Sequence, residues 1–195
     1  MKANNREYTK KLVLMAVLTA IVAVLSYFGG FIKIGGLASI SLTLIPVVIG
    51  SALCGPLAGA WLGFVSGVVF FATADAIFWL GINIFGTIFI VLLKGAMSGF
   101  LAGICYKLLE KKNQYLAVII SAIVCPVVNT GIFLIGCRLF FWNTVLAGAQ
   151  SNEMGVIGYL LVFFVGLNFI LELVVNVVLS PTIMKIINVR KSMEK

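Results

Sequence analysis

Long apolar runs, separated by short polar or glycine-rich stretches, make up most of this 195-residue chain. The hydrocarbon core of a bilayer is about 30 Å thick and needs about 20 apolar residues in each helix that crosses it. The pattern therefore predicts an all-α polytopic membrane protein, with six transmembrane helices that form a single domain over residues 1–195. The predicted helices cover approximately residues 10–28, 37–53, 56–72, 84–109, 115–141 and 155–187.

Proline, glycine and polar residues mark the breaks between these runs. Gly55 and Pro56 predict a tight turn in which the proline suits the first turn of the next helix. Pro46 lies inside the second run, where we expect it to bend the helix or to free a backbone carbonyl. Residues 73–83 and 142–154 are less apolar and predict outer loops, the first of them re-entrant or lying at the membrane interface.

Composition supports the membrane class and excludes several kinds of chemistry. The chain is 62% hydrophobic and 10% charged, and its mean hydropathy is +1.19. A β-barrel would instead show short segments of alternating polarity. There is no histidine, and the four cysteines show no metal-binding spacing, so His-based metal sites and Ser-His triads are excluded. We expect no metal, no cofactor and no enzymatic activity.

The net charge of +8 could suggest a nucleic-acid partner, but the positions of the basic residues indicate a membrane protein instead. Most of them flank apolar runs, as the positive-inside rule expects, and an even number of helices places both termini on one side. We therefore predict a multi-pass protein of the cell membrane with both termini in the cytoplasm and no nucleic-acid partner. The flanking residues are Lys2, Arg6, Lys10, Lys11, Lys107, Lys111, Lys112, Lys185, Arg190, Lys191 and Lys195.

The last apolar run carries the most informative polar pattern. Asn168, Glu172 and Asn176 are spaced four apart, which places them on one face of a helix. A carboxylate in such a run faces a protein interior or a polar cavity, because exposing it to lipid is costly. We interpret this face as one wall of a binding site. The alternative is a polar stripe that only joins helices, and for Asn176 both interpretations stay open.

Other polar and aromatic residues extend the candidate site. Lys94 lies near the middle of its predicted helix and either pairs with Glu172, extends to the interface or binds a ligand. Asn129 offers a hydrogen-bond donor and acceptors beside Pro126. Arg138 suits a ligand carboxylate or phosphate, although near a helix end it can also extend to the interface. Three aromatic residues could stack on a flat ligand or anchor the chain at the interface: Trp79, Trp142 and Tyr159.

Small residues recur every four positions on three of the predicted helices. Glycines at 55, 59, 63 and 67, and at 95, 99 and 103, favour close packing between helices inside the protein. Ala16 and Ala20 form a similar stripe on the first helix. This stripe either packs internally or presents a docking face to a partner.

Several of these motifs occur together in one order along the chain. They are Ala16-x-x-x-Ala20, Ile45-Pro46, the segment 54–60 that begins Cys-Gly-Pro, Leu93-Lys94-Gly95-Ala96, Asn168-x-x-x-Glu172-x-x-x-Asn176 and Ser180-Pro181. In this order, and over nearly its whole length, the chain resembles the substrate-binding S-components of energy-coupling factor (ECF) vitamin transporters.

The resemblance implies a six-helix S-component bundle that binds a vitamin or related micronutrient from outside. It implies docking through Ala16 and Ala20 onto a transmembrane coupling subunit that carries two ATPases. It also implies a ligand site toward the outer side, built from the later helices and capped by outer loops. The implied site residues are Lys94, Asn129, Asn168 and Glu172. Asn176 lies deeper than this site, and Arg138 is a candidate through its residue type alone. The candidate caps are residues 33–39 and 73–83, the second of which contains Trp79 and Asn83.

Two other functions compete with this one, and the sequence leaves the identity of the ligand open. A self-sufficient secondary transporter could use Glu172 as its coupling group, but six helices without an evident inverted repeat are few for one. An intramembrane enzyme finds little support without histidine or paired aspartates. The chain has no Walker A pattern, so another subunit must hydrolyse any ATP. Lys94 and Arg138 favour a carboxylate ligand such as pantothenate or a folate, whereas Glu172 leaves room for riboflavin or pyridoxine-type vitamins.

Overall fold

The computed structural model describes residues 2–29, 33–34, 38–39 and 42–193, and helices make up nearly all of them. The long helices are α1 (Lys2–Gly29), α3 (Pro56–Phe70), α5 (Ile84–Leu109) and α6 (Gln114–Phe140). The shorter ones are α2 (Leu44–Cys54), α4 (Ala74–Ile82), α7 (Trp142–Ser151), α8 (Val156–Tyr159), the π-helix η1 (Leu160–Val165), α9 (Gly166–Val178) and α10 (Ser180–Met193). The predicted all-α fold class is confirmed.

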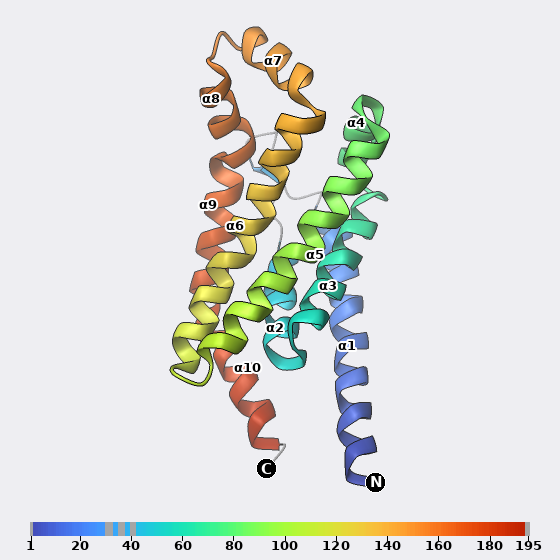
Figure 1. The fold of residues 1–195 in the computed structure, drawn as a ribbon, viewed down its shortest axis with the longest axis vertical. Helices are drawn as coiled ribbons and strands as arrows, with labels where there is room; N and C mark the ends of the chain where they lie inside the picture. Colours follow the sequence, from blue (N-terminus) through green and yellow to red (C-terminus); the bar gives the residue numbers. More distant parts are fainter. Residues whose placement is uncertain (1, 30–32, 35–37, 40–41, 194–195) are drawn as a thin grey trace.

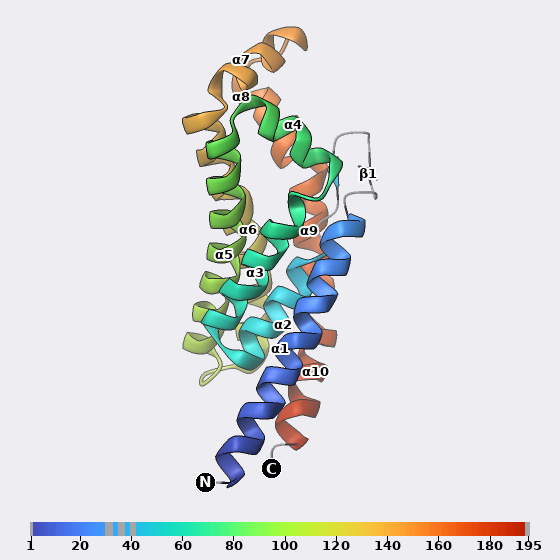
Figure 2. The same ribbon diagram turned by 90° about the vertical axis from the view of Figure 1, so that its right-hand side faces the viewer.

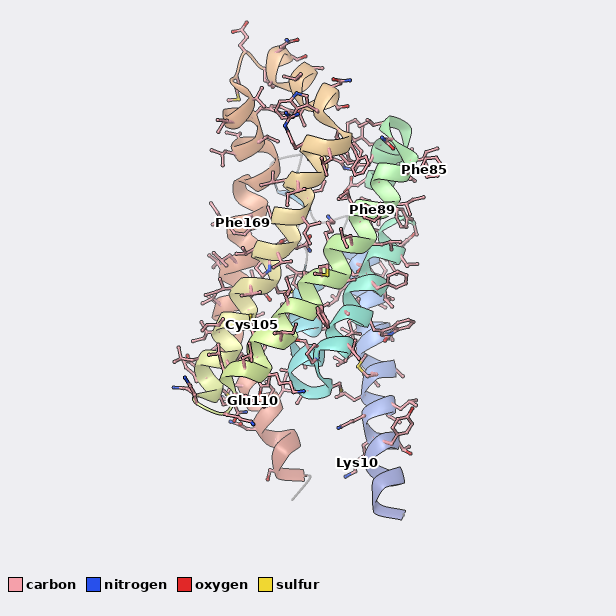
Figure 3. The ribbon with its side chains drawn as sticks, viewed as in Figure 1. Lys10, Phe85, Phe89, Cys105, Glu110 and Phe169 are labelled. Carbon is pink, nitrogen blue, oxygen red and sulfur yellow. The ribbon has the colours of Figure 1, made fainter. Side chains whose placement is uncertain are left out.

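The helices form an elongated bundle, with the two chain termini at one end and α4, α7 and α8 at the other (Figures 1 and 2). We call these the termini end and the α4 end. Lys10 and Glu110 lie toward the termini end, whereas Phe85 and Phe89 lie toward the α4 end of α5 (Figure 3). The two phenylalanines are largely exposed, as expected for apolar side chains on the outer surface of a membrane bundle.

Local sequence signals account for several helix starts. Gly55 has φ +98°, a left-handed conformation that glycine adopts without strain, and Pro56 follows it as the first residue of α3. The Asn83 side chain accepts a hydrogen bond of 2.8 Å from the Gly86 N–H at the start of α5. Asn113 caps α6 in the same way. The tight turn expected at residues 54–56 is therefore present.

The glycine stripes bring α3 and α5 into direct backbone contact. A Cβ atom added to Gly63 would overlap the carbonyl group of Gly95, and one added to Gly95 would overlap that of Gly63. Gly59 and Gly99 show the same reciprocal relation one turn away. The prediction of close packing inside the protein is confirmed for these four glycines, because no larger residue fits at this crossing. It is wrong for Gly55, which precedes α3 and where an added Cβ meets nothing within 4 Å.

Two hydrophobic cores hold the bundle. The larger core joins α1, α2, α3, α5, α6 and α10, around Val22, Val47, Leu62, Val118 and Ile187. The smaller core lies around Cys137 of α6, Val145 of α7, and Phe141, which lies between the two helices. Trp79 of α4 and Tyr159 of α8 pack against it, so this aromatic cluster joins the elements of the α4 end.

By length and composition, three described helices are long and apolar enough to cross a membrane. They lie at Tyr8–Gly29, Ile84–Leu109 and Gln114–Phe140. The number rises to five if each of two bent pairs counts as one span: α3 with α4, bent by 84°, and the α9 and α10 pair, bent by 43°. The chain is therefore a multi-pass membrane protein, and the count of six helices stays a prediction.

The start of the second helix differs from the prediction. The run 37–53 was expected to be helical, but α2 begins at Leu44 and the backbone at Ala38–Ser39 pairs antiparallel with Lys33–Ile34 as β2 and β1. Residues 37, 40 and 41 lie outside the described part. Pro46 is consequently the third residue of α2. Its missing N–H costs nothing there, because the first-turn N–H groups have no partner within the helix.

The two segments expected as outer loops contain helices. Residues 73–83 hold α4, and residues 142–154 hold α7, which buries Val145 and Ala149 one turn apart. Their polar residues suggested loops, yet short amphipathic helices satisfy their own backbone groups and bury one apolar face. The last run, 155–187, is divided among α8, η1, α9 and α10, and α1 starts earlier than the predicted residue 10.

Candidate functional site

A layer of polar side chains lies inside the bundle, where α5, α6 and α9 meet. We define this polar layer as Lys94 and Ser98 of α5, Cys125 of α6, and Glu172 and Asn176 of α9. Ser98, Cys125 and Asn176 are buried, and Glu172 is only 8% exposed. α6 packs against both α5 and α9, which brings the three helices together. Polar groups at this depth are costly unless they find partners, so the layer marks a candidate site.

Lys94 is held between aromatic rings. Its Nζ atom lies 4.9 Å from the centre of the Phe133 ring of α6 and 5.9 Å from that of the Phe70 ring of α3. An ammonium group over an aromatic face gains about 0.5–2 kcal/mol, with the larger values in desolvated sites. These rings supply no hydrogen-bond acceptor, so the three N–H donors of the ammonium remain suited to an anionic partner.

Glu172 interacts with Lys94 through space, as the sequence suggested for these two charges. Among the described residues, however, they do not form a contact ion pair. Glu172 also lies within electrostatic range of the buried Cys125. The Ser98 hydroxyl donates a hydrogen bond of 2.8 Å to the carbonyl of Gly95. Lys94 in turn acts on Cys137, which lies further along α6. The layer therefore holds an ammonium and a carboxylate within electrostatic range of each other.

Asn176 is fixed on one side and open on the other. Its Nδ2 group donates a hydrogen bond of 2.8 Å to the backbone carbonyl of Glu172, and the Ser180 hydroxyl donates one of 3.0 Å to the carbonyl of Asn176. Its buried Oδ1 atom has no hydrogen-bond partner among the described residues. A buried acceptor of this kind is satisfied by a water or by a ligand donor.

The predicted polar face of α9 is present in part. Glu172 and Asn176 share a buried face of the helix. Asn168 lies one turn before Glu172, and its side chain lies outside the described part of the structure. Asn129 of α6 is half-buried, one turn beyond the buried Pro126. The helix continues through this proline from Gln114 to Phe140.

Trp79 lies in the aromatic cluster at the α4 end. Its ring meets Phe133 edge-on at 5.4 Å and Phe141 at 5.1 Å between ring centres. Edge-to-face pairs of this kind each contribute about 0.5–1.5 kcal/mol beyond the area they bury. Phe133 thus contacts Trp79 of α4 and the ammonium of Lys94.

The remaining predicted residues have local partners near the α4 end. Arg138 is exposed, and its guanidinium lies 4.2 Å from the centre of the Trp142 ring. Asn83 caps α5 through its side-chain oxygen, which accepts a hydrogen bond from Gly86. Tyr159 packs on Gly148 of α7, where an added Cβ would overlap the phenol. The interactions described for these residues do not bring them into the polar layer.

The stripe on α1 faces outward. Ala16 and Ala20 are exposed, whereas Leu18 and Val22 on the opposite side are buried in the larger core. Beside the stripe, the Thr19 hydroxyl accepts a hydrogen bond of 3.2 Å from the Trp61 indole of α3. The interpretation in which these alanines pack inside the bundle is wrong for this structure, which leaves the exposed stripe available to another molecule.

Sequence reasoning missed Phe70, Phe133, Ser98 and two of the cysteines as part of the site. A signal was present for most of them. Cys125, Asn129, Phe133 and Cys137 are spaced four apart on α6, and Ser98 follows Lys94 by four on α5. The spacing rule that identified the face of α9 applies equally to these helices. Phe70 carried no comparable signal.

The comparisons with known proteins identify the family. The family model described as ECF transporter, substrate-specific component, matches residues 10–184. No curated protein and no solved structure matched the chain. The matched segment includes α2 to α9, all residues of the polar layer and the exposed alanines of α1. The chain belongs to the family of substrate-specific components of ECF transporters, which are transporter subunits and not enzymes.

Proposed function

We propose that this chain is the high-affinity substrate-binding membrane subunit of an ECF-type ABC importer for a vitamin or related micronutrient. The observation that carries the proposal is the polar layer, because charged and amide groups inside a membrane bundle mark substrate pathways. The family match supports the same assignment.

In this proposal the ligand binds to Lys94, Asn129, Asn168, Glu172 and Asn176. Lys94 contributes a positive charge for a ligand carboxylate, and Glu172 and the free Oδ1 atom of Asn176 accept hydrogen bonds from hydroxyl or amine groups. Trp79, Asn83 and Arg138 lie nearer the α4 end, at the mouth of the site. The pairing of a cation with acceptors favours pantothenate or a folate, while riboflavin and pyridoxine-type vitamins fit the acceptors alone.

The proposal also assigns the orientation in the membrane. The basic clusters of the chain lie at the termini and in the turn between α5 and α6, and the turn and both termini lie toward the same end of the bundle (Figure 1). Cytoplasmic segments are rich in lysine and arginine, so we assign the termini end to the cytoplasm. The α4 end then faces the outside, from which the substrate enters.

Energy must come from partners in this proposal, since the chain has no Walker A pattern. We propose docking onto a transmembrane coupling subunit with two ATPase subunits, through the exposed stripe of Ala16 and Ala20. Small residues permit close approach of another helix, which is how helices associate in lipid.

Mass spectrometry of the ligand retained on the purified protein, followed by calorimetry with that compound, tests the binding function. We expect a vitamin-like molecule that binds without ATP. Reconstitution in liposomes that contain this chain alone should give no accumulation of the compound. Accumulation there would overturn the subunit proposal and favour a secondary transporter that uses Glu172 as its coupling group.

The docking face is tested by adding bulk to it. Ala16→Trp combined with Ala20→Trp should abolish uptake in cells, because two indoles prevent close helix approach. Ligand affinity of the isolated variant should stay within about threefold, since the polar layer lies on other helices and overpacking acts locally. The matched control is Val17→Trp with Ile21→Trp, two exposed positions on a different face of α1, which should retain uptake. Uptake by the alanine variant would contradict the assignment of this face.

A further inference from the structure

Three side chains from three helices form a continuous column between the α4 end and the polar layer. Trp79 of α4 meets the edge of Phe133 of α6, and Phe133 presents its ring to the ammonium of Lys94 of α5. The distances are 5.4 Å between the ring centres and 4.9 Å from Nζ to the Phe133 centre. Phe133 is thus shared between the helix that covers the α4 end and the cation of the site.

The attachment of α4 to the bundle is limited. Ala76 is its only described residue that is fully buried, and Ile77 and Phe78 are 74% and 60% exposed. The helix is bent by 84° from α3 at one end, and at the other end Asn83 has an extended backbone with φ −155°. Between these two bends, the ring of Trp79 packs against the aromatic cluster, and its carbonyl accepts a hydrogen bond of 2.8 Å from the Thr87 hydroxyl of α5.

Modification of Cys137 can show whether a solute passes the contact between Trp79 and Phe133. It belongs to the same aromatic cluster as Trp79, is 1% exposed, and lies within electrostatic range of Lys94. A solute that reaches Cys137 from the α4 end therefore also comes under the influence of the ammonium charge. Cys125 lies deeper, buried beside Ser98, and is not part of the aromatic cluster.

We propose that Trp79 is a latch that holds α4 over Phe133, and that release of this latch admits an anionic substrate to Lys94. The ring contacts of Trp79 close the route, and the ammonium behind Phe133 selects negative charge once the route is open. This inference rests on the proposed binding function, but its test requires no knowledge of the ligand.

The test measures modification of Cys137 in purified protein whose Cys54 and Cys105 are replaced by serine. The probes are two methanethiosulfonates of similar size, one with an anionic sulfonate and one with a cationic trimethylammonium group. Trp79→Ala should increase modification of Cys137 by the anionic reagent about tenfold or more, because it removes both edge-to-face contacts. Trp79→Phe, which keeps an aromatic ring, should stay close to the wild-type rate.

Charge selection is tested in the opened protein. Adding Lys94→Met to Trp79→Ala should slow the anionic reagent about threefold or more relative to the cationic one, because a change in the reactivity of the thiol affects both reagents equally whereas only the anion is attracted by the ammonium. Trp142→Ala is the matched control for loss of an indole at the same end, since Trp142 stacks on Arg138, and it should leave Cys137 protected.

Three outcomes would overturn the proposal. Equal rates of Cys137 modification in the wild type and in Trp79→Ala would contradict the role of Trp79. Equal effects of Lys94→Met on the rates of both reagents would contradict the charge selection. Modification of Cys125 together with Cys137 in Trp79→Ala would show general loosening of the bundle instead of a local opening. These measurements use no ligand, whereas the proposed function is tested by the retained compound and its affinity in the wild-type protein, so the two failures are distinguishable.

Discussion

The crossing of α3 and α5 and the meeting of α6 with α9 are two interior contacts with opposite chemistry. At the first, Gly59 and Gly63 face Gly99 and Gly95, and backbone touches backbone. At the second, Glu172 and Asn176 bring a carboxylate and an amide into a region that also holds Cys125. α5 takes part in both, since Lys94 directly precedes Gly95 in the chain.

The difference shows that one interior contact of this bundle holds the helices rigidly, while another keeps polar groups available to a ligand. Backbone contact leaves no room for a side chain to move, so the glycine crossing fixes the height and direction of α5. The polar layer keeps an acceptor without a described partner and an ammonium that rests on ring faces. An acceptor or an ammonium of this kind can bind a ligand without first breaking a hydrogen bond inside the protein.

The largest expected effect comes from filling the glycine crossing. Gly63→Ala should lower the free energy of unfolding by about 3 kcal/mol, because the added Cβ overlaps the backbone of Gly95, which cannot move aside. The control is Gly131→Ala on α6, where an added Cβ meets nothing within 4 Å. That change should leave stability equal or slightly higher, since alanine favours a helix over glycine. Thermal unfolding of both purified variants measures the difference, and equal midpoints would refute the rigid crossing.

Smaller effects are expected from substitutions in the polar layer. They should lower ligand affinity more than they lower the free energy of unfolding. Glu172→Ala or Asn129→Ala should weaken ligand affinity at least about tenfold, or about 1.4 kcal/mol, while the protein still folds. Calorimetry with the retained compound measures the loss. Glu110→Ala, which removes a carboxylate at the termini end, is the control and should not change affinity. Unchanged affinity in both site variants would remove the site assignment.

The smallest effect concerns the stability of an Asn176 variant. Asn176→Leu removes a buried acceptor that has no described partner and replaces it with an apolar group of similar size. The unfolding free energy should therefore stay within about 1 kcal/mol of the wild type, since losing an unsatisfied group offsets the loss of the bond to Glu172. A much larger drop in the unfolding midpoint would show that the amide supports the fold and would contradict the contrast between the two contacts.

Periodicity predicted much of this arrangement, because it reports which residues share a face. It predicted the all-α class, the close approach at the glycines, and the buried face that carries Glu172 and Asn176. It did not predict that Phe70 and Phe133 flank Lys94, since the neighbours of a face depend on how helices pack in three dimensions. The spacing of Lys94 and Glu172 in the sequence carries no such information.

Helix ends were predicted less well than helix existence. Residues 73–83 and 142–154 contain polar side chains and were interpreted as loops, yet α4 and α7 form there. Such segments follow a short amphipathic pattern that a search for long apolar runs overlooks. Pro46 was expected inside a longer helix, but it lies in the first turn of α2, which begins at Leu44, and Ala38–Ser39 form β2.

The π-helix η1, at Leu160–Val165, has an evolutionary consequence. A π-turn accommodates one more residue than an α-turn, and such turns are frequent near functional sites. Because each residue of an ordinary helix rotates the chain by about 100°, one inserted residue would otherwise turn the whole polar face of α9 away from α6. With the extra residue absorbed in η1, relatives that lack it can keep their equivalents of Glu172 and Asn176 in place. We therefore expect single-residue gaps within the family to fall at 160–165 rather than inside α9.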